Sequence, residues 1–79
     1  MTNIPAWKFD ALRDAILAIC VEETVFTDLF KLVPPQLTEE QLTKLGSINW
    51  HVTTVKLELE VRGEITRVPG AKPQKLIRT

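Results

Sequence analysis

Apolar residues in the first quarter of the chain recur at three- and four-residue steps, at Phe9, Leu12, Ile16, Ile19 and Cys20. That spacing puts them on one face of a helix and predicts a stripe that faces a core. Pro5 marks where this helix begins, because proline is favoured at the first helical position. β-branched and acidic residues accumulate over 21–23, where we expect the helix to end.

The next segment predicts a short strand followed by a second helix. Residues 24–26 are apolar or β-branched and form the candidate strand. Thr27 is a candidate N-cap, because its hydroxyl can accept a bond from an unpaired backbone N–H, and Asp28 suits the first helical turn. Pro34 and Pro35 end this helix, since a residue before proline is pushed out of the helical region.

A third and a fourth helix follow in close succession. Thr38 and Gln41 have the spacing of a capping box, in which each side chain bonds to the other's backbone N–H. The short helix that begins there ends at Gly46, and either Ser47 or Asn49 caps the next one. Two helices joined so closely resemble a helix-turn-helix.

The last helix extends to Arg62, is closed by Gly63, and is apolar on two sides. One side carries Val52, Val55 and Leu59, and the roughly opposite side carries Trp50, Leu57 and Val61. Such a helix must be covered on both sides. We expect the earlier helices to cover one side and the segment after Gly63 to cover the other. Between them lies a polar strip of Asn49, Thr53, Lys56 and Glu60, which a recognition helix would offer to the major groove.

Two strands joined by a turn are predicted after Gly63, over Ile65–Val68 and Gln74–Arg78. The five residues between them include Pro69 and Pro73, which discourage edge-to-edge pairing with other chains. The elements together predict an α+β fold, a winged helix-turn-helix of three to four helices followed by a two-stranded β-hairpin wing. With 79 residues, the chain fits a single domain over 1–79.

Charge is distributed unevenly, although the formal net charge is zero. Residues 1–60 contain five Lys/Arg and nine Asp/Glu, a net of −4, whereas residues 61–79 contain five Lys/Arg and one Asp/Glu, a net of +4. This polarity attracts anions to the predicted hairpin. The alternative is a flexible basic tail that only aids solubility.

The segment from Leu57 to Gly70 resembles the small winged-helix domain at the C-terminus of the bacterial DNA-processing protein, and it is similar to wings of marR-type repressors. The shared pattern is alternating Leu and Glu, a helix-ending glycine, an isoleucine, an arginine and Pro-Gly. The whole chain, including residues 50–55, resembles small stand-alone bacterial winged-helix proteins. The resemblance implies the fold more than the function, because winged helices also serve as protein-interaction modules.

Two hypotheses about function follow, beside the alternative of a structural fragment with no partner of its own. In the first, the chain binds double-stranded DNA as a transcriptional regulator or accessory factor, through Asn49, Thr53, Lys56, Arg67, Lys72, Lys75 and Arg78. In the second, it is a protein-interaction module or homodimer without DNA binding, anchored by Trp7, Phe30, Trp50 and Leu57, since tryptophan is enriched at binding hot spots. Glu58 and Glu60 repel phosphate, and in this the last helix departs from DNA-binding relatives.

The residue pattern predicts no enzyme, cofactor, metal site or small-molecule substrate. Cys20 has no second cysteine to pair with, and His51 has no catalytic partners at a recognisable spacing. No run approaches the roughly 18 apolar residues that span a bilayer, and charges interrupt any signal-peptide region in the first twenty residues. We therefore expect no membrane partner and a cytoplasmic location.

Overall fold

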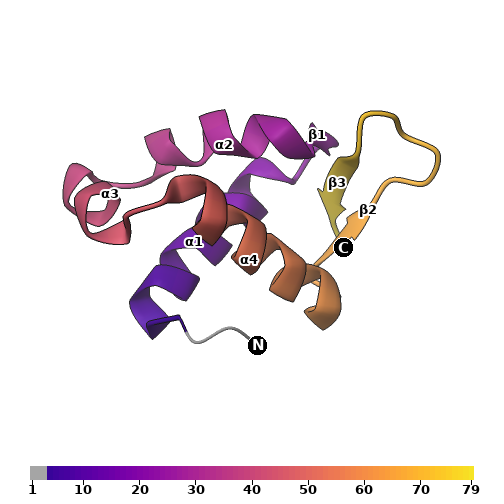
Figure 1. Ribbon diagram of the computed structural model, residues 1–79. Helices are drawn as coiled ribbons and strands as arrows, with labels where there is room; N and C mark the ends of the chain where they lie inside the picture. Colours follow the sequence, from indigo (N-terminus) through magenta and orange to yellow (C-terminus); the bar gives the residue numbers. More distant parts are fainter. Residues whose placement is uncertain (1–3) are drawn as a thin grey trace.

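In the computed structural model, which describes residues 4–79, two long helices cross and a small sheet lies at one end of them (Figure 1). The elements are α1 (Ala6–Ile19), β1 (Thr24–Val25), the 3-10 turn η1 (Phe26–Asp28), α2 (Leu29–Leu32), the 3-10 turn η2 (Pro34–Gln36), α3 (Glu39–Leu45), α4 (Ile48–Arg62), β2 (Ile65–Arg67) and β3 (Lys75–Arg78). This is an α+β architecture, as predicted.

Capping side chains set the starts of α3 and α4. The Thr38 hydroxyl accepts a bond from the Gln41 backbone N–H at 3.1 Å, and the Gln41 side chain accepts one from the Thr38 N–H at 2.9 Å, which confirms the predicted capping box. Ser47, rather than Asn49, caps α4, and its hydroxyl accepts a bond from the Trp50 N–H at 3.3 Å. These two caps fix where the short third helix and the long fourth helix begin.

The prediction that Thr27 caps the second helix is wrong. The chain enters η1 directly from β1, and α2 begins at Leu29 without a side-chain cap. The Phe26 N–H donates to the carbonyl of Gln74 at 2.8 Å. This bond ties the residue before Thr27 to the end of the hairpin loop, so Thr27 does not stand at a free helix start. Pairing between distant segments therefore overrides the local capping signal.

The sheet has three antiparallel strands in the order β1-β3-β2, one more than the predicted hairpin. Ile65 pairs with Arg78 in the hairpin, and Thr24 pairs with Leu76 on the other side of β3. The predicted strands at 24–26, 65–68 and 74–78 are confirmed to within one or two residues. Because β3 is paired on both sides, the alternative of a flexible basic tail is wrong for residues 75–78.

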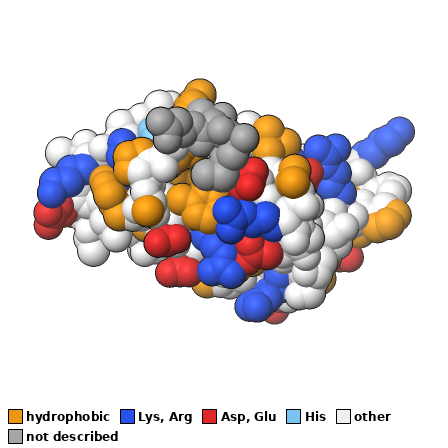
Figure 2. Space-filling view, turned by 90° about the horizontal axis from the view of Figure 1, so that it is seen from below, with side chains coloured by type: hydrophobic (Ala, Val, Ile, Leu, Met, Phe, Trp, Pro, Cys, Tyr) orange, Lys and Arg blue, Asp and Glu red, His pale blue; other side chains and the backbone are white. Residues whose placement is uncertain are grey.

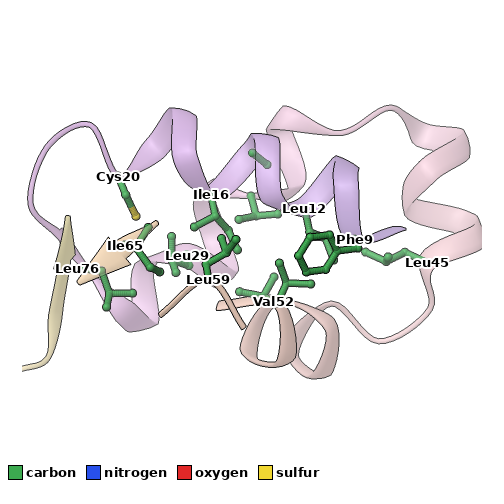
Figure 3. Close-up of a cluster of buried hydrophobic side chains, with 13 residues drawn as sticks. Phe9, Leu12, Ile16, Cys20, Leu29, Leu45, Val52, Leu59, Ile65 and Leu76 are labelled. Atoms are coloured by element: carbon green, nitrogen blue, oxygen red, sulfur yellow. The ribbon is translucent and has the colours of Figure 1, made fainter. Parts of the chain in front are cut away.

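The core extends from the crossing of α1 and α4 to the underside of the sheet (Figure 3). Phe9 and Leu45 lie at the α3 end, Leu12, Ile16, Val52 and Leu59 fill the crossing, and Cys20, Ile65 and Leu76 lie at the sheet end. The predicted stripe of the first helix is thus confirmed as a core face. Burial raises the pKa of the Cys20 thiol, so this cysteine packs as a small neutral side chain.

Candidate interaction surfaces

The two apolar sides of α4 differ in how far they are buried. Val52, Val55 and Leu59 are fully buried against the core. On the opposite side, the exposed fractions are 48% for Trp50, 46% for Leu57 and 82% for Val61. The expectation that the hairpin covers this second side is wrong. We name the row formed by these three residues and the partly buried Thr54 the α4 stripe.

The hairpin packs against a polar side of α4 instead. Gly63 ends the helix in the left-handed conformation, with φ of 76°, and the Glu64 N–H donates back to the carbonyl of Leu59 at 2.9 Å. That turn sends β2 along the side that carries Lys56 and Glu60, where Arg67 lies within ion-pair distance of Glu60. The large apolar side chains of the α4 stripe are left about half exposed or more.

Lys56 was expected on a solvent-facing strip, but only 3% of its surface is exposed. Its ammonium nitrogen lies 2.6 Å from a carboxylate oxygen of Glu60 and 4.6 Å from the ring centroid of Phe26. The long aliphatic stem of lysine packs between α4 and the hairpin, while Glu60 supplies the counter-charge that burial demands. Lys56 is therefore not available to a DNA phosphate or base.

Arg67 closes the same ion cluster from the hairpin side. Its Nε lies 3.3 Å from both carboxylate oxygens of Glu60, and a terminal guanidinium nitrogen lies 3.2 Å away. The Gln74 amide sits beside it, and with its oxygen turned toward Arg67 it accepts bonds at 3.0 and 3.2 Å. Partial burial by itself raises the pKa of Glu60, but hydrogen bonds from Lys56 and Arg67 outweigh it, and the pKa is lowered.

The remaining candidate cations do not form one cluster. Lys72, Lys75 and Arg78 make no salt bridge to any residue of the described range 4–79. Lys75 and Arg78 occupy opposite ends of β3 and, three residues apart, point to opposite faces of the sheet, about 10 Å apart along the strand. Only Lys72 and Lys75 lie near the hairpin tip. In Figure 2, basic side chains protrude at the hairpin end, while acidic and basic side chains alternate elsewhere on that face.

Of the polar strip predicted on the last helix, only Asn49 and Thr53 lie outside the ion cluster of Lys56 and Glu60. Asn49 is exposed and Thr53 is partly buried, at one edge of the α4 stripe. No Lys or Arg accompanies them there. Glu58, on the other flank of the stripe, is paired with Arg62, with 3.3 Å between the guanidinium and the carboxylate. The outer face of α4 is therefore apolar, with Asn49 and Thr53 on one flank and the Glu58–Arg62 ion pair on the other.

Two of the four predicted interface anchors lie on the α4 stripe, and two lie elsewhere. Trp50 lies edge-on to the His51 ring, with 4.8 Å between the ring centroids, and 48% of Trp50 is exposed. Trp7 belongs to a hollow of about 380 Å³ that it lines with Thr38, Glu40, Gln41 and Lys44. Phe30 is partly buried, in an edge-to-face contact with Phe26 at 5.4 Å, and it supports the core. Val61, the most exposed apolar residue on the helix, was missing from the predicted anchors.

An ion pair between α1 and the start of the hairpin had no signal in the sequence. The Arg13 Nε donates to the Glu64 carboxylate at 2.7 Å, across 51 residues of chain. This hydrogen bond lowers the pKa of Glu64 and raises that of Arg13. Oppositely charged residues this far apart cannot be paired from a pattern of local spacing. The contact ties the turn after α4 to the first helix.

These observations define a small α+β domain whose longest helix leaves one apolar side uncovered. No helix among residues 4–79 is long and apolar enough to cross a bilayer. The chain belongs to the family of unknown function DUF6958, whose model matches residues 1–76. Comparisons with curated proteins and with solved structures found no match.

Proposed function

We propose that the chain is a winged-helix domain that acts as a protein-association module through the outer face of α4. The element order supports the fold: a helix, a short strand, two short helices, a long helix and a hairpin whose last strand pairs with the first. In this arrangement α4 takes the position of the recognition helix and the β2–β3 hairpin that of the wing.

The α4 stripe is the observation that carries the proposal. Trp50, Leu57 and Val61 are large apolar side chains, each about half exposed or more, on one side of a 15-residue helix. Exposed apolar rows of this kind on a small folded domain mark interaction sites. Tryptophan with neighbouring aliphatic residues is the composition that anchors protein interfaces.

The same face is a poor match for DNA. A recognition helix places hydrogen-bonding side chains against base edges and cations beside phosphates. The outer face of α4 offers Asn49 and Thr53 for the first task, and no free cation for the second, because Lys56 is buried against Glu60. Of the two functions expected from the sequence, protein association therefore has the better support.

The test uses purified tagged chain as bait, with matched charge insertions. Leu57→Glu places a carboxylate in the α4 stripe, and Leu32→Glu places one at an equally exposed leucine of α2, with exposed fractions of 46% and 44%. We expect the wild-type bait and the Leu32→Glu bait to retain a bound protein that the Leu57→Glu bait loses. The same protein, once purified, should bind again to the wild-type bait. If no protein depends on Leu57, the proposal fails.

Trp50 provides a second readout of what covers the face. In a Trp7→Phe background it is the only tryptophan, so its emission and acrylamide quenching report on α4 alone. We expect a protein partner to shield Trp50 and saturating duplex DNA to leave it accessible. Shielding by DNA that disappears with Leu57→Glu contradicts the proposal and restores the recognition-helix hypothesis.

A second candidate, nucleic-acid contact through the wing alone, is favoured by the unpaired Lys72 and Lys75 near the tip. Two phosphate contacts predict a log–log salt slope of about −2 for duplex binding. A mobility-shift titration at several salt concentrations measures it, with Lys72→Ala/Lys75→Ala as the test variant. Lys8→Ala/Lys31→Ala, which removes the same charge from the helices, is the control.

A further inference from the structure

We infer that the partner of the α4 stripe is a second copy of this chain, packed with α4 antiparallel to its equivalent across a two-fold axis. This inference rests on the proposed function, since it names the protein that the α4 stripe binds. The argument depends on the spacing of the stripe, on its side-chain sizes and on the charges along its flanks.

The spacing of the stripe is that of a helix-pairing seam. Its members follow one another at steps of four, three and four residues, from Trp50 through Thr54 and Leu57 to Val61. This is the alternation of a and d positions that lets two helices pack at a small crossing angle. The core-facing side of the same helix is separate, because Val52, Val55 and Leu59 are fully buried by α1 and the other elements. A second helix can therefore dock without disturbing the fold.

Side-chain size favours the antiparallel direction. With the axis midway between Thr54 and Leu57, Trp50 of one copy packs against the partner's Val61, and Thr54 packs against the partner's Leu57. Each contact then joins a larger side chain with a smaller one, which is how facing helices interdigitate. The parallel direction instead places the two Trp50 indoles against each other and leaves the Thr54 pair facing itself.

The flanking charges favour the same direction. His51 and Glu58 lie along one flank of the stripe, and Thr53 and Glu60 lie along the other. Antiparallel packing puts like flanks together, so that Glu58 comes near the partner's His51 and Glu60 comes near the partner's Thr53. Parallel packing instead places Glu58 beside the partner's other flank, away from the partner's His51, where Glu60 is already paired with Lys56 and Arg67.

The expected interface is small. The stripe spans about 16 Å, from eleven steps of 1.5 Å between Trp50 and Val61. Standard interfaces bury about 800 Å² per partner, so the flanking residues are needed as well. A dimer in fast exchange with monomer is expected at micromolar concentrations. Because a dimer with this geometry occupies the outer face of α4, it also excludes that face from the major groove.

The test is sedimentation equilibrium of the full chain over about a hundred-fold range of concentration. We expect concentration-dependent dimers for the wild type and for Leu32→Glu, and a dissociation constant raised at least about tenfold for Leu57→Glu. Circular dichroism checks that each variant is folded. Mixing Leu57→Glu with Leu57→Lys is expected to restore dimers, because the interface of a mixed dimer then carries one negative and one positive charge.

Oxidative cross-linking fixes the direction. In the antiparallel dimer, a pair of Val61→Cys thiols lies about 16 Å apart along the axis, whereas a pair of Thr54→Cys thiols flanks the two-fold axis. We expect cross-links for Thr54→Cys and none for Val61→Cys, and Cys20 is fully buried and adds no background.

Three results overturn the inference. One is a wild-type chain that stays monomeric at every concentration, and the second is a dimer that Leu57→Glu leaves intact. The third is efficient cross-linking through Val61→Cys. A monomeric chain whose α4 stripe still captures a different protein refutes the homodimer while the proposed protein-association function stands. Loss of all stripe-dependent binding refutes both.

Discussion

Two sides of the 15-residue helix α4 differ in whether their side chains find partners within the chain. On one side, Lys56 is buried beneath the hairpin, and Glu60 and Arg67 supply its electrostatic partners from the same chain. On the other side, Trp50 and Leu57 are about half exposed and Val61 is mostly exposed. The contrast shows that contacts among the described residues 4–79 complete the charged side, whereas these contacts leave the apolar side partly exposed. Substitutions on the two sides should therefore affect different measurements.

The largest expected effect separates two leucines that lie two residues apart on opposite sides of α4. Leu59 is fully buried and Leu57 is 46% exposed. Leu59→Ala removes core contacts and leaves a cavity, so we expect a loss of about 3 kcal/mol in the free energy of unfolding, against less than about 0.5 kcal/mol for Leu57→Ala. Denaturant titration of the dilute chain measures both. Equal losses contradict the assignment of the two sides.

The next largest effect concerns the buried ion cluster. Glu60→Gln removes the counter-charge of Lys56, and we expect it to cost about 2 kcal/mol, less than for a fully buried pair because Glu60 keeps some contact with solvent. Glu58→Gln is the matched control. It breaks only the pair with Arg62 on the helix surface and should cost less than about 0.5 kcal/mol. Urea unfolding of the two variants compares a partnered buried charge with a surface pair.

The free energy of unfolding should also fall in acid, because the ion pairs of Glu60 and Glu64 are lost when these carboxylates are protonated. Lys56 and Arg67 lower the pKa of Glu60, and Arg13 lowers that of Glu64. A lowered folded-state pKa means that the contribution to stability is complete above the ordinary value for glutamate, about 4.3. It is lost as pH falls through the folded-state pKa. Thermal unfolding between neutral pH and about pH 3 should show this decline. The decline should be shallower in Glu60→Gln, and an unchanged pH profile in that variant contradicts the assignment to Glu60.

The smallest expected effect on stability is at the hairpin tip. Lys72 and Lys75 make no ion pair with the residues that the structure describes, so Lys72→Ala/Lys75→Ala should change the free energy of unfolding by less than about 0.5 kcal/mol. Thermal denaturation measures this. A larger loss means that these lysines support the fold and are not available to a ligand.

Prediction from the sequence worked where a signal is local. The capping box at Thr38, the helix-ending Gly63 and the two strands that follow it each concern neighbours within a few positions, and each is present in the structure. The pairing of Thr24 with Leu76 joins residues far apart in the chain. No local pattern specifies such a partner, and the Thr27 cap fails for the same reason.

The candidate site was predicted less well than the fold. Asn49 and Thr53 remain at the edge of the outer face of α4, but helical periodicity could not say which side of the helix the hairpin would cover. A lysine in a polar strip is ordinarily a solvent-exposed residue. Lys56 is buried because a turn at Gly63, a carboxylate one helical turn away and the hairpin segment that carries Arg67 converge on it.

The amino-acid sequence by itself determined the order of the helices and strands, the core-facing stripe of α1 and the gathering of positive charge in the last nineteen residues. These depend on spacing, capping and composition, which act within a few residues. Only the tertiary structure decided that β1 joins the hairpin, that Lys56 is enclosed and that Trp50, Leu57 and Val61 face solvent. The physical reason is that burial depends on which distant segments pack together, and the same helix can be covered on either of two sides until that packing is fixed.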